Sequence, residues 1–118
     1  MTPLEIAFEE TSDAVVVRVV GEIDITNLGY FSEELQRAGA VPVGLVAVDL
    51  AGVKYLDSAG IRTLFELART LEMGRREMAI VVPATSPLRR LFTITEIGTV
   101  VRIVASVDEA ITRGASPT

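Results

Sequence analysis

Strand-like and helix-like patterns of apolar residues alternate along the chain. Apolar residues alternate from Leu4 to Phe8, and a β-branched run from Ala14 to Val20 follows a polar turn. Together these segments predict an antiparallel hairpin. The run from Leu45 to Leu50 is almost continuously apolar, which is typical of a central strand covered on both faces. Shorter apolar runs at 78–82 and 100–104 predict the remaining strands.

Segments with helical spacing separate these strands. Apolar positions recur from Leu28 to Ala38, with Thr26 or Asn27 available as the cap and Gly39 as the end of the helix. The longest predicted helix runs from residue 59 to about residue 73. Its apolar stripe, which we expect to be core, comprises Ile61, Leu64, Phe65, Ala68 and Leu71.

The last two predicted helices are marked by their caps. Ser86 and Pro87 predict a capping residue followed by proline at the first helical position. Ser106 to Glu109 matches a capping box that opens a terminal helix, which Gly114 stops. We expect residues 115–118 to form a disordered tail.

This element order predicts an α/β fold. An N-terminal antiparallel hairpin would lead into a mostly parallel mixed sheet of about four or five strands with about four helices. The sequence contains no internal repeat, linker or low-complexity block. Residues 1–114 are therefore expected to form a single domain.

Composition excludes several function classes. The 118 residues include no cysteine and no histidine, which rules out disulfides, thiol nucleophiles and serine–histidine catalysis. A phosphate-binding GxxxxGK loop is also missing, so we expect neither an enzyme nor a bound cofactor. The carboxylates of Asp24 and Asp57 alone are too few to indicate a magnesium site, and we expect no metal.

Charge and hydropathy bear on partners and location. The net charge of −5 opposes attachment to nucleic acid or anionic lipid, which favours a protein partner. No apolar run approaches the ~18 residues of a membrane span, and the first residues lack the features of a secretory signal. We therefore expect a cytoplasmic protein that does not enter the membrane.

The candidate functional residue is Ser58. The pattern places it after a turn that follows the strand ending at Leu50, as the N-cap of the long helix. A phosphoryl group there would be favoured by the positive helix end and would concentrate negative charge beside Asp57. The alternative is a purely structural cap worth about 1 kcal/mol. Asp57 would either extend that cap or order the loop for a kinase.

Three segments, in this order, resemble the STAS domain of bacterial anti-sigma factor antagonists. The resemblance runs from about Val15 to Val104, and its segments are Gly21-Glu22-Ile23-Asp24, Asp57-Ser58-Ala59-Gly60 and Ser86-Pro87-Leu88-Arg89-Arg90-Leu91-Phe92. It implies that the unphosphorylated protein binds an anti-sigma factor, which is a serine kinase, and thereby frees a sigma factor in stress or sporulation signalling. Phosphorylation of the serine after the motif aspartate, here Ser58, would end this binding, and a serine phosphatase would restore it.

The resemblance also implies a partner-binding surface. Its residues would be Asp24, Thr26, Asn27, Asp57, Ser58, Ala59, Gly60 and Arg62. Capping of the next helix is the alternative for Asp24, and an ordinary exposed ion pair with Glu66 is the alternative for Arg62. The family usually carries serine or threonine where this chain has Ala59. That difference favours a second hypothesis, a scaffold or accessory subunit of the stressosome or lipid-transport type without a phosphorylation switch.

Overall fold

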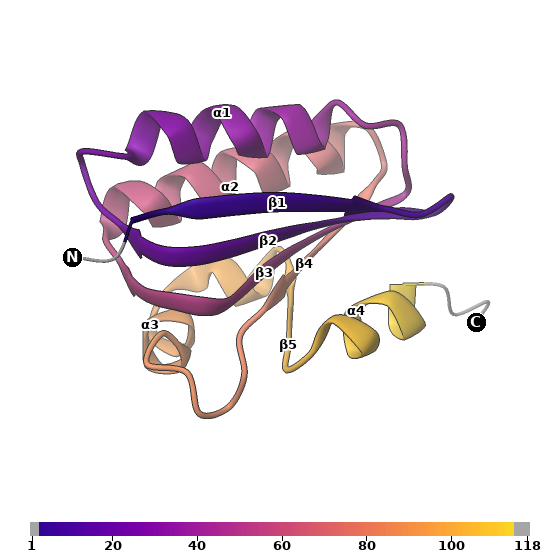
Figure 1. Ribbon diagram of the computed structural model, residues 1–118. Helices are drawn as coiled ribbons and strands as arrows, with labels where there is room; N and C mark the ends of the chain where they lie inside the picture. The colour runs from indigo at the N-terminus through magenta and orange to yellow at the C-terminus, as the bar shows by residue number, and fades with distance from the viewer. Residues whose placement is uncertain (1–2, 115–118) are drawn as a thin grey trace.

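The computed structural model describes residues 3–114, which form a sheet with helices on both faces (Figure 1). The sheet has five strands in the order β1-β2-β3-β4-β5. β1 and β2 pair antiparallel, and every later pair is parallel. The strands are β1 (Glu5–Glu10), β2 (Ala14–Ile23), β3 (Leu45–Leu56), β4 (Glu77–Val81) and β5 (Arg102–Val104). The predicted α/β class, with its hairpin and mostly parallel sheet, is confirmed.

Two long helices cover one face of the sheet. In Figure 1, α1 and α2 lie together on this face, and α4 packs against the other side. The helical segments are α1 (Leu28–Gly39), α2 (Ser58–Met73), α3 (Arg89–Ile94), the short 3-10 helix η1 (Glu96–Thr99) and α4 (Val107–Gly114). The predicted core stripe of α2 is buried except for Phe65, which is half-buried.

The alternation of side chains along β2 divides the core in two. Val15, Val17 and Val19 belong to the large apolar cluster under α1 and α2. Ala14 and Val16 point the other way and belong to the smaller cluster beneath α4. Both faces of the strand are therefore buried from Ala14 to Val17, which explains why these four residues are all apolar.

β3 is longer than the sequence pattern predicts. The strand pattern ends at Leu50, yet the chain stays extended to Leu56, so the predicted turn after Leu50 is wrong. The register with β2 shifts between Arg18 and Val20 and again after Gly21, each time giving β3 one extra residue. Such bulges break the two-residue alternation by which a strand is recognised. With these extra residues β3 extends to Leu56, two residues before α2 begins at Ser58.

The third and fourth helices differ from prediction at their ends. α3 begins at Arg89, so Ser86 and Pro87 do not open it. The Ser86 Oγ instead accepts from the Leu88 N–H at 3.1 Å, and the Ser86 carbonyl accepts from the Arg89 N–H, which makes a separate turn. The predicted Ser106 cap is confirmed, because its Oγ accepts from the Glu109 N–H at 3.1 Å.

The predicted last strand, 100–104, is shorter in the structure. β5 occupies only Arg102–Val104, since η1 takes up the preceding Glu96–Thr99. The last described residue of α4 is Gly114, the residue expected to stop it. The predicted disordered tail at 115–118 lies outside the described residues.

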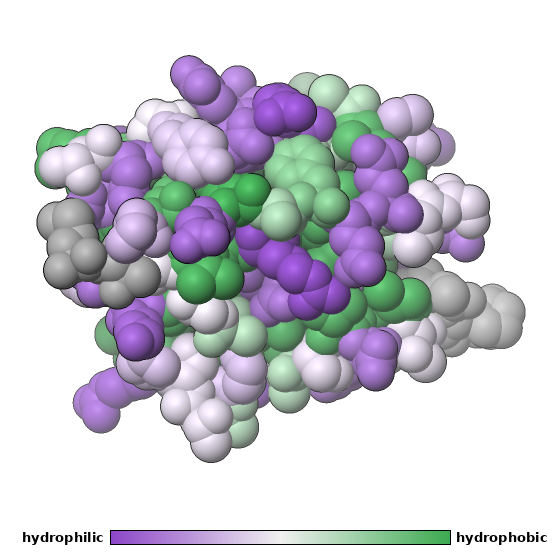
Figure 2. Space-filling view, in the orientation of Figure 1, coloured by the Kyte–Doolittle hydropathy of each residue, from purple (hydrophilic) through white to green (hydrophobic). Residues whose placement is uncertain are grey.

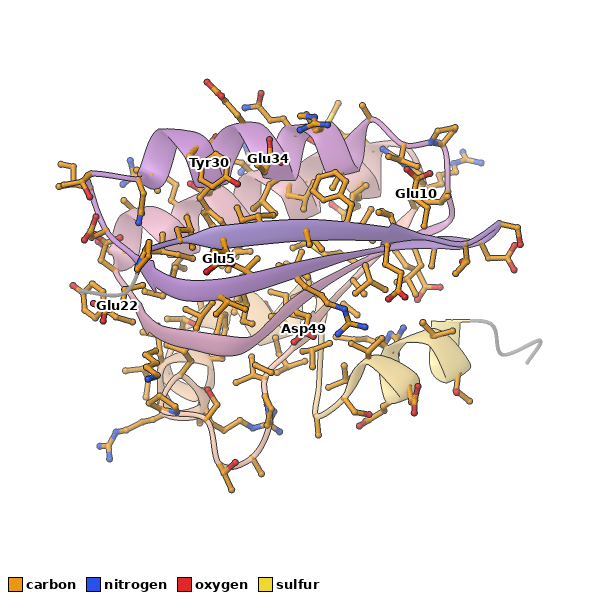
Figure 3. The ribbon with its side chains drawn as sticks, viewed as in Figure 1. Glu5, Glu10, Glu22, Tyr30, Glu34 and Asp49 are labelled. Carbon is orange, nitrogen blue, oxygen red and sulfur yellow. The ribbon has the colours of Figure 1, made fainter. Side chains whose placement is uncertain are left out.

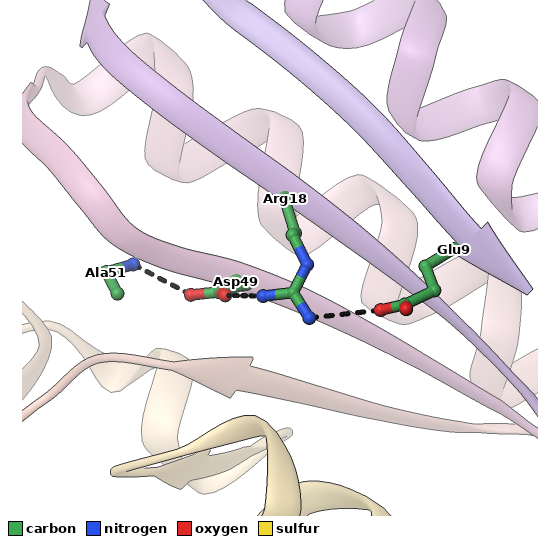
Figure 4. A network of polar contacts seen from close by, with 4 residues as sticks. All are labelled: Glu9, Arg18, Asp49 and Ala51. Carbon is green, nitrogen blue, oxygen red and sulfur yellow. Dashed lines mark hydrogen bonds and ion pairs between the residues drawn. The ribbon is translucent and has the colours of Figure 1, made fainter.

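A polar network ties the first three strands together (Figure 4). The Arg18 guanidinium donates to Glu9 at 3.0 Å and to Asp49 at 3.1 Å, and the second Asp49 oxygen accepts from the Ala51 N–H at 2.9 Å. The Asp49 side chain is only 12% exposed, so these bonds replace the water that it has lost. Figure 2, in the orientation of Figure 1, shows purple hydrophilic side chains between green apolar ones on this face of the molecule.

Candidate functional site

β2 and β3 end side by side. Ile23 pairs with Leu56 as the last pair of the two parallel strands. Asp24 and Asp57 are therefore the residues that directly follow the two neighbouring strand ends. Figure 3 shows Glu22 at this end of β2, and Figure 1 shows α1 and α2 beginning there. The carboxyl ends of parallel strands are where α/β sheets present their binding loops. The predicted site residues therefore meet at one edge of the sheet.

Asp57 caps α2. Its backbone is extended, with φ −91 and ψ −177, and its Oδ1 accepts from the Gly60 N–H at 3.0 Å. The prediction that Ser58 is the N-cap is therefore wrong. Because β3 continues to Leu56, a single residue lies between strand and helix, and the aspartate carboxylate occupies the capping position.

Ser58 is the first residue of α2. Its side chain is exposed, and no hydrogen bond to its hydroxyl occurs within residues 3–114. The N-terminus of a helix carries free N–H groups and a partial positive charge, which favour an anion close by. The structure thus combines an accessible hydroxyl with a local environment suited to a phosphoryl group.

The residues after Ser58 bring α2 close to the strands. Gly60 is buried, and a Cβ added there would overlap the Leu56 side chain and lie 3.4 Å from Ile23 Cγ2. Ala59 is half-buried, and its carbonyl accepts from the Thr63 hydroxyl at 3.0 Å. The absence of a side chain at Gly60 lets the helix begin directly against the ends of β2 and β3.

Arg62 lies one turn beyond Ser58 on the same side of α2 and is exposed. The ion pair with Glu66, offered as its ordinary structural role, does not form within the described part of the chain. The Arg62 guanidinium is therefore not held away from the Ser58 end of the helix.

The loop between β2 and α1 is closed by side-chain hydrogen bonds. The Asn27 Oδ1 accepts from the Asp24 N–H at 3.0 Å, and its Nδ2 donates to the Glu22 carbonyl at 2.8 Å. The Asp24 Oδ1 accepts from the Thr26 N–H at 2.9 Å and from the Thr26 hydroxyl at 2.5 Å.

These bonds change the roles predicted for the loop residues. Of the two residues predicted as possible caps of α1, Thr26 and Asn27, it is Asn27 that occupies the N-cap position, but its side chain makes no capping bond because both of its ends hold the loop. The Thr26 hydroxyl and then the Thr26 N–H lower the pKa of Asp24, since both stabilise its charged form.

One exposed residue of this loop was not among the predicted site residues. Ile25 is 84% exposed, between Asp24 and Thr26. The available signal was a single apolar residue inside a polar segment that joins a strand to a helix.

Two further findings concern the described residues. No group of three or more acidic side chains comes together there in a way that could hold a metal ion. Within 3–114, no helix has the length and hydropathy needed to cross a membrane.

The structure is an α/β domain with an exposed serine at a strand–helix junction, and comparison with known proteins places this fold in a family. The family profile described as the STAS domain matches residues 5–110. The chain belongs to the STAS domain family, so the resemblance inferred from the sequence is confirmed.

Solved structures share the fold. An anti-sigma factor antagonist from Mycobacterium paratuberculosis has a TM-score of 0.88 at 21% identity, with 97% of this chain and 96% of that chain covered. The anti-sigma factor antagonist SpoIIAA in its unphosphorylated form has a TM-score of 0.69 at 21% identity, with 92% of this chain and 96% of that chain covered. The Bacillus cell fate determinant SpoIIAA in its phosphorylated form has a TM-score of 0.66 at 23% identity, with 92% of this chain and 98% of that chain covered.

Proposed function

We propose that the protein is an anti-sigma factor antagonist that acts by binding and is not an enzyme. The unphosphorylated form binds an anti-sigma factor with serine kinase activity, and the sigma factor is released in the cytoplasm. Phosphorylation of Ser58 ends this binding, and a serine phosphatase restores it. The observation that carries the proposal is the exposed, unbonded Ser58 hydroxyl at the first position of α2, directly after the capping Asp57.

The geometry suits phosphoryl transfer to Ser58. Its oxygen would bond to the γ-phosphorus of ATP while the bond to ADP breaks, and the hydroxyl proton would leave to a base of the kinase. The helix N-terminus favours the product anion. The α2 cap survives, because Asp57 rather than Ser58 supplies it.

The same geometry makes the phosphate a switch. It adds about −2 charge beside the Asp57 carboxylate and three oxygens that retain water. A partner that closes over the unmodified turn would have to accommodate both the charge and the added volume. Binding of the phosphorylated form is therefore expected to be much weaker.

The named relatives support this role. The M. paratuberculosis protein and SpoIIAA are both described as anti-sigma factor antagonists. SpoIIAA has structures in an unphosphorylated and a phosphorylated form, and these are the two states that the proposed switch requires of this chain.

The proposed binding surface surrounds the turn. Thr26, Ser58 and Arg62 are exposed at or near the same edge of the sheet, which suits direct contact with the partner. The other residues assigned to the surface give it shape, namely Asp24 and Asn27 in the loop and Asp57, Ala59 and Gly60 at the start of α2.

The experiment measures binding to purified anti-sigma factors of the source organism, one at a time, by titration calorimetry without ATP. The unmodified protein and Ser58→Ala should bind one of them equally, while Ser58→Asp should bind roughly a hundredfold more weakly. Ser12→Asp is the matched control, since Ser12 is also exposed but lies in the β1–β2 turn at the opposite end of β2. Equal binding by Ser58→Asp and Ser12→Asp would contradict the switch.

A further inference from the structure

Ile25 makes no contribution to the core. It is 84% exposed, and it belongs to neither of the two apolar clusters. Single apolar residues are common on protein surfaces and need no explanation by themselves. Ile25 differs because the chain on both sides of it is held in place.

Four side-chain hydrogen bonds fix the loop around Ile25. Asn27 bonds to the backbone at Glu22 and at Asp24, and Asp24 accepts twice from Thr26. The residues before and after Ile25 are therefore fastened to each other and to the end of β2. An apolar side chain presented from a preorganised loop loses little conformational entropy when a partner covers it.

These bonds also occupy polar groups that were expected to contact a partner. The Asp24 Oδ1 accepts hydrogen bonds from Thr26, and both the oxygen and the nitrogen of the Asn27 amide bond to the loop backbone. The Ile25 side chain is highly exposed and, being apolar, takes no part in these hydrogen bonds.

Ile25 lies at the same edge as Ser58. It follows the paired residue Ile23 by two positions, just as Ser58 follows Leu56, the partner of Ile23. The start of α2 is packed against this pair at Gly60. A partner that contacts the Ser58 turn therefore meets the Ile25 loop on the neighbouring strand end.

We propose that Ile25 is the apolar anchor of the binding surface, and that Asp24, Thr26 and Asn27 are positioning residues that hold it. Its side chain enters an apolar pocket of the anti-sigma factor, so this inference rests on the proposed function. A phosphate on Ser58 would bring a strongly hydrated group to the edge of that dry contact. Phosphorylation would thus weaken binding in two ways, by disturbing the apolar contact of Ile25 and by adding charge beside Asp57.

The test uses the anti-sigma factor that binds the unmodified protein and measures its affinity for Ile25 variants by calorimetry. Ile25→Ala should weaken binding at least about tenfold, while Ile25→Leu should stay within a few-fold, because a pocket tolerates a residue of equal volume. Met73→Ala is the control, since Met73 is 80% exposed but ends α2 far from Ser58. The thermal midpoint of unfolding should be unchanged by Ile25→Ala.

A double-mutant cycle tests the positioning role. Asn27→Ala should weaken binding in the unmodified background and have much less effect when Ile25 is already alanine, since Asn27 acts through Ile25. Equal effects of Asn27→Ala in both backgrounds would overturn that role.

The outcomes separate this inference from the proposed function. If Ser58→Asp loses binding while Ile25→Ala binds like the unmodified protein, the anchor is overturned and the switch stands. If Ile25→Ala loses binding while Ser58→Asp does not, the anchor stands and the switch fails. If none of the anti-sigma factors binds the unmodified protein, both are overturned.

Discussion

The carboxylate of Asp57 accepts a hydrogen bond from the backbone N–H of Gly60 at 3.0 Å. This bond caps α2, and the hydroxyl of the neighbouring Ser58 is left without a partner among residues 3–114. The capping role and the proposed regulatory role thus belong to adjacent side chains. Chemical change at Ser58 need not disturb the start of the helix.

Substitutions at the two residues should therefore differ in their effect on stability. Asp57→Ala removes the cap and should lower the free energy of unfolding by about 1 kcal/mol, within a range of about 0.5–2. Ser58→Ala removes an exposed hydroxyl and should change it by less than about 0.5 kcal/mol. Urea unfolding followed by circular dichroism measures both. A larger loss for Ser58→Ala than for Asp57→Ala would show that the serine is the cap.

The glycines near the starts of α1 and α2 offer a second matched comparison. A Cβ at Gly60 would overlap the Leu56 side chain, so Gly60→Ala should destabilise the fold by about 1–3 kcal/mol through overpacking. Gly29 has open space around it, and Gly29→Ala should be neutral or stabilise by up to about 1 kcal/mol through helix propensity. The same urea experiment applies. Equal effects would mean that α2 is not packed tightly against the ends of β2 and β3.

The Asp24 loop should respond to pH in a defined direction. The Thr26 hydroxyl and N–H lower the pKa of Asp24, so the carboxylate stabilises the closed loop above its ordinary pKa. That stabilisation is lost as the pH falls through the lowered, folded-state value. Thr26→Val removes the hydroxyl but keeps the N–H, so the Asp24 pKa should rise toward the ordinary value without fully reaching it. Carbon-detected NMR titration of the Asp24 carboxyl measures this, and an unchanged pKa in Thr26→Val would contradict the bond.

The strongly periodic elements could be predicted from the sequence, whereas several of their junctions could not. The stripe of α2 is buried on one side and leaves a clear helical period, and β2 is buried on both faces at its start and leaves a recognisable β-branched run. β3 beyond Leu50 carries bulges, and these interrupt the alternation that would have revealed a longer strand. The helix was expected to begin at residue 59 but begins at Ser58, so its cap is Asp57, one residue earlier than expected.

The candidate site, too, could be predicted only in part from the sequence. Ser58 and the neighbouring loop could be located from their motifs. The hydrogen bonds of Asn27 to the loop backbone, on which the proposed role of Ile25 rests, depend on how β2 meets α1 in space. Local sequence carries no direct signal of that arrangement.

Phosphorylation in a defined mixture tests the central claim most directly. The purified protein is incubated with the anti-sigma factor that binds it and with MgATP, and phosphate is located by mass spectrometry of the peptides that cover residues 54–62. The account predicts one phosphoryl group per chain, on Ser58, and none on the Ser58→Ala variant. Absence of phosphate from Ser58, or equal phosphorylation of Ser58→Ala, would contradict it.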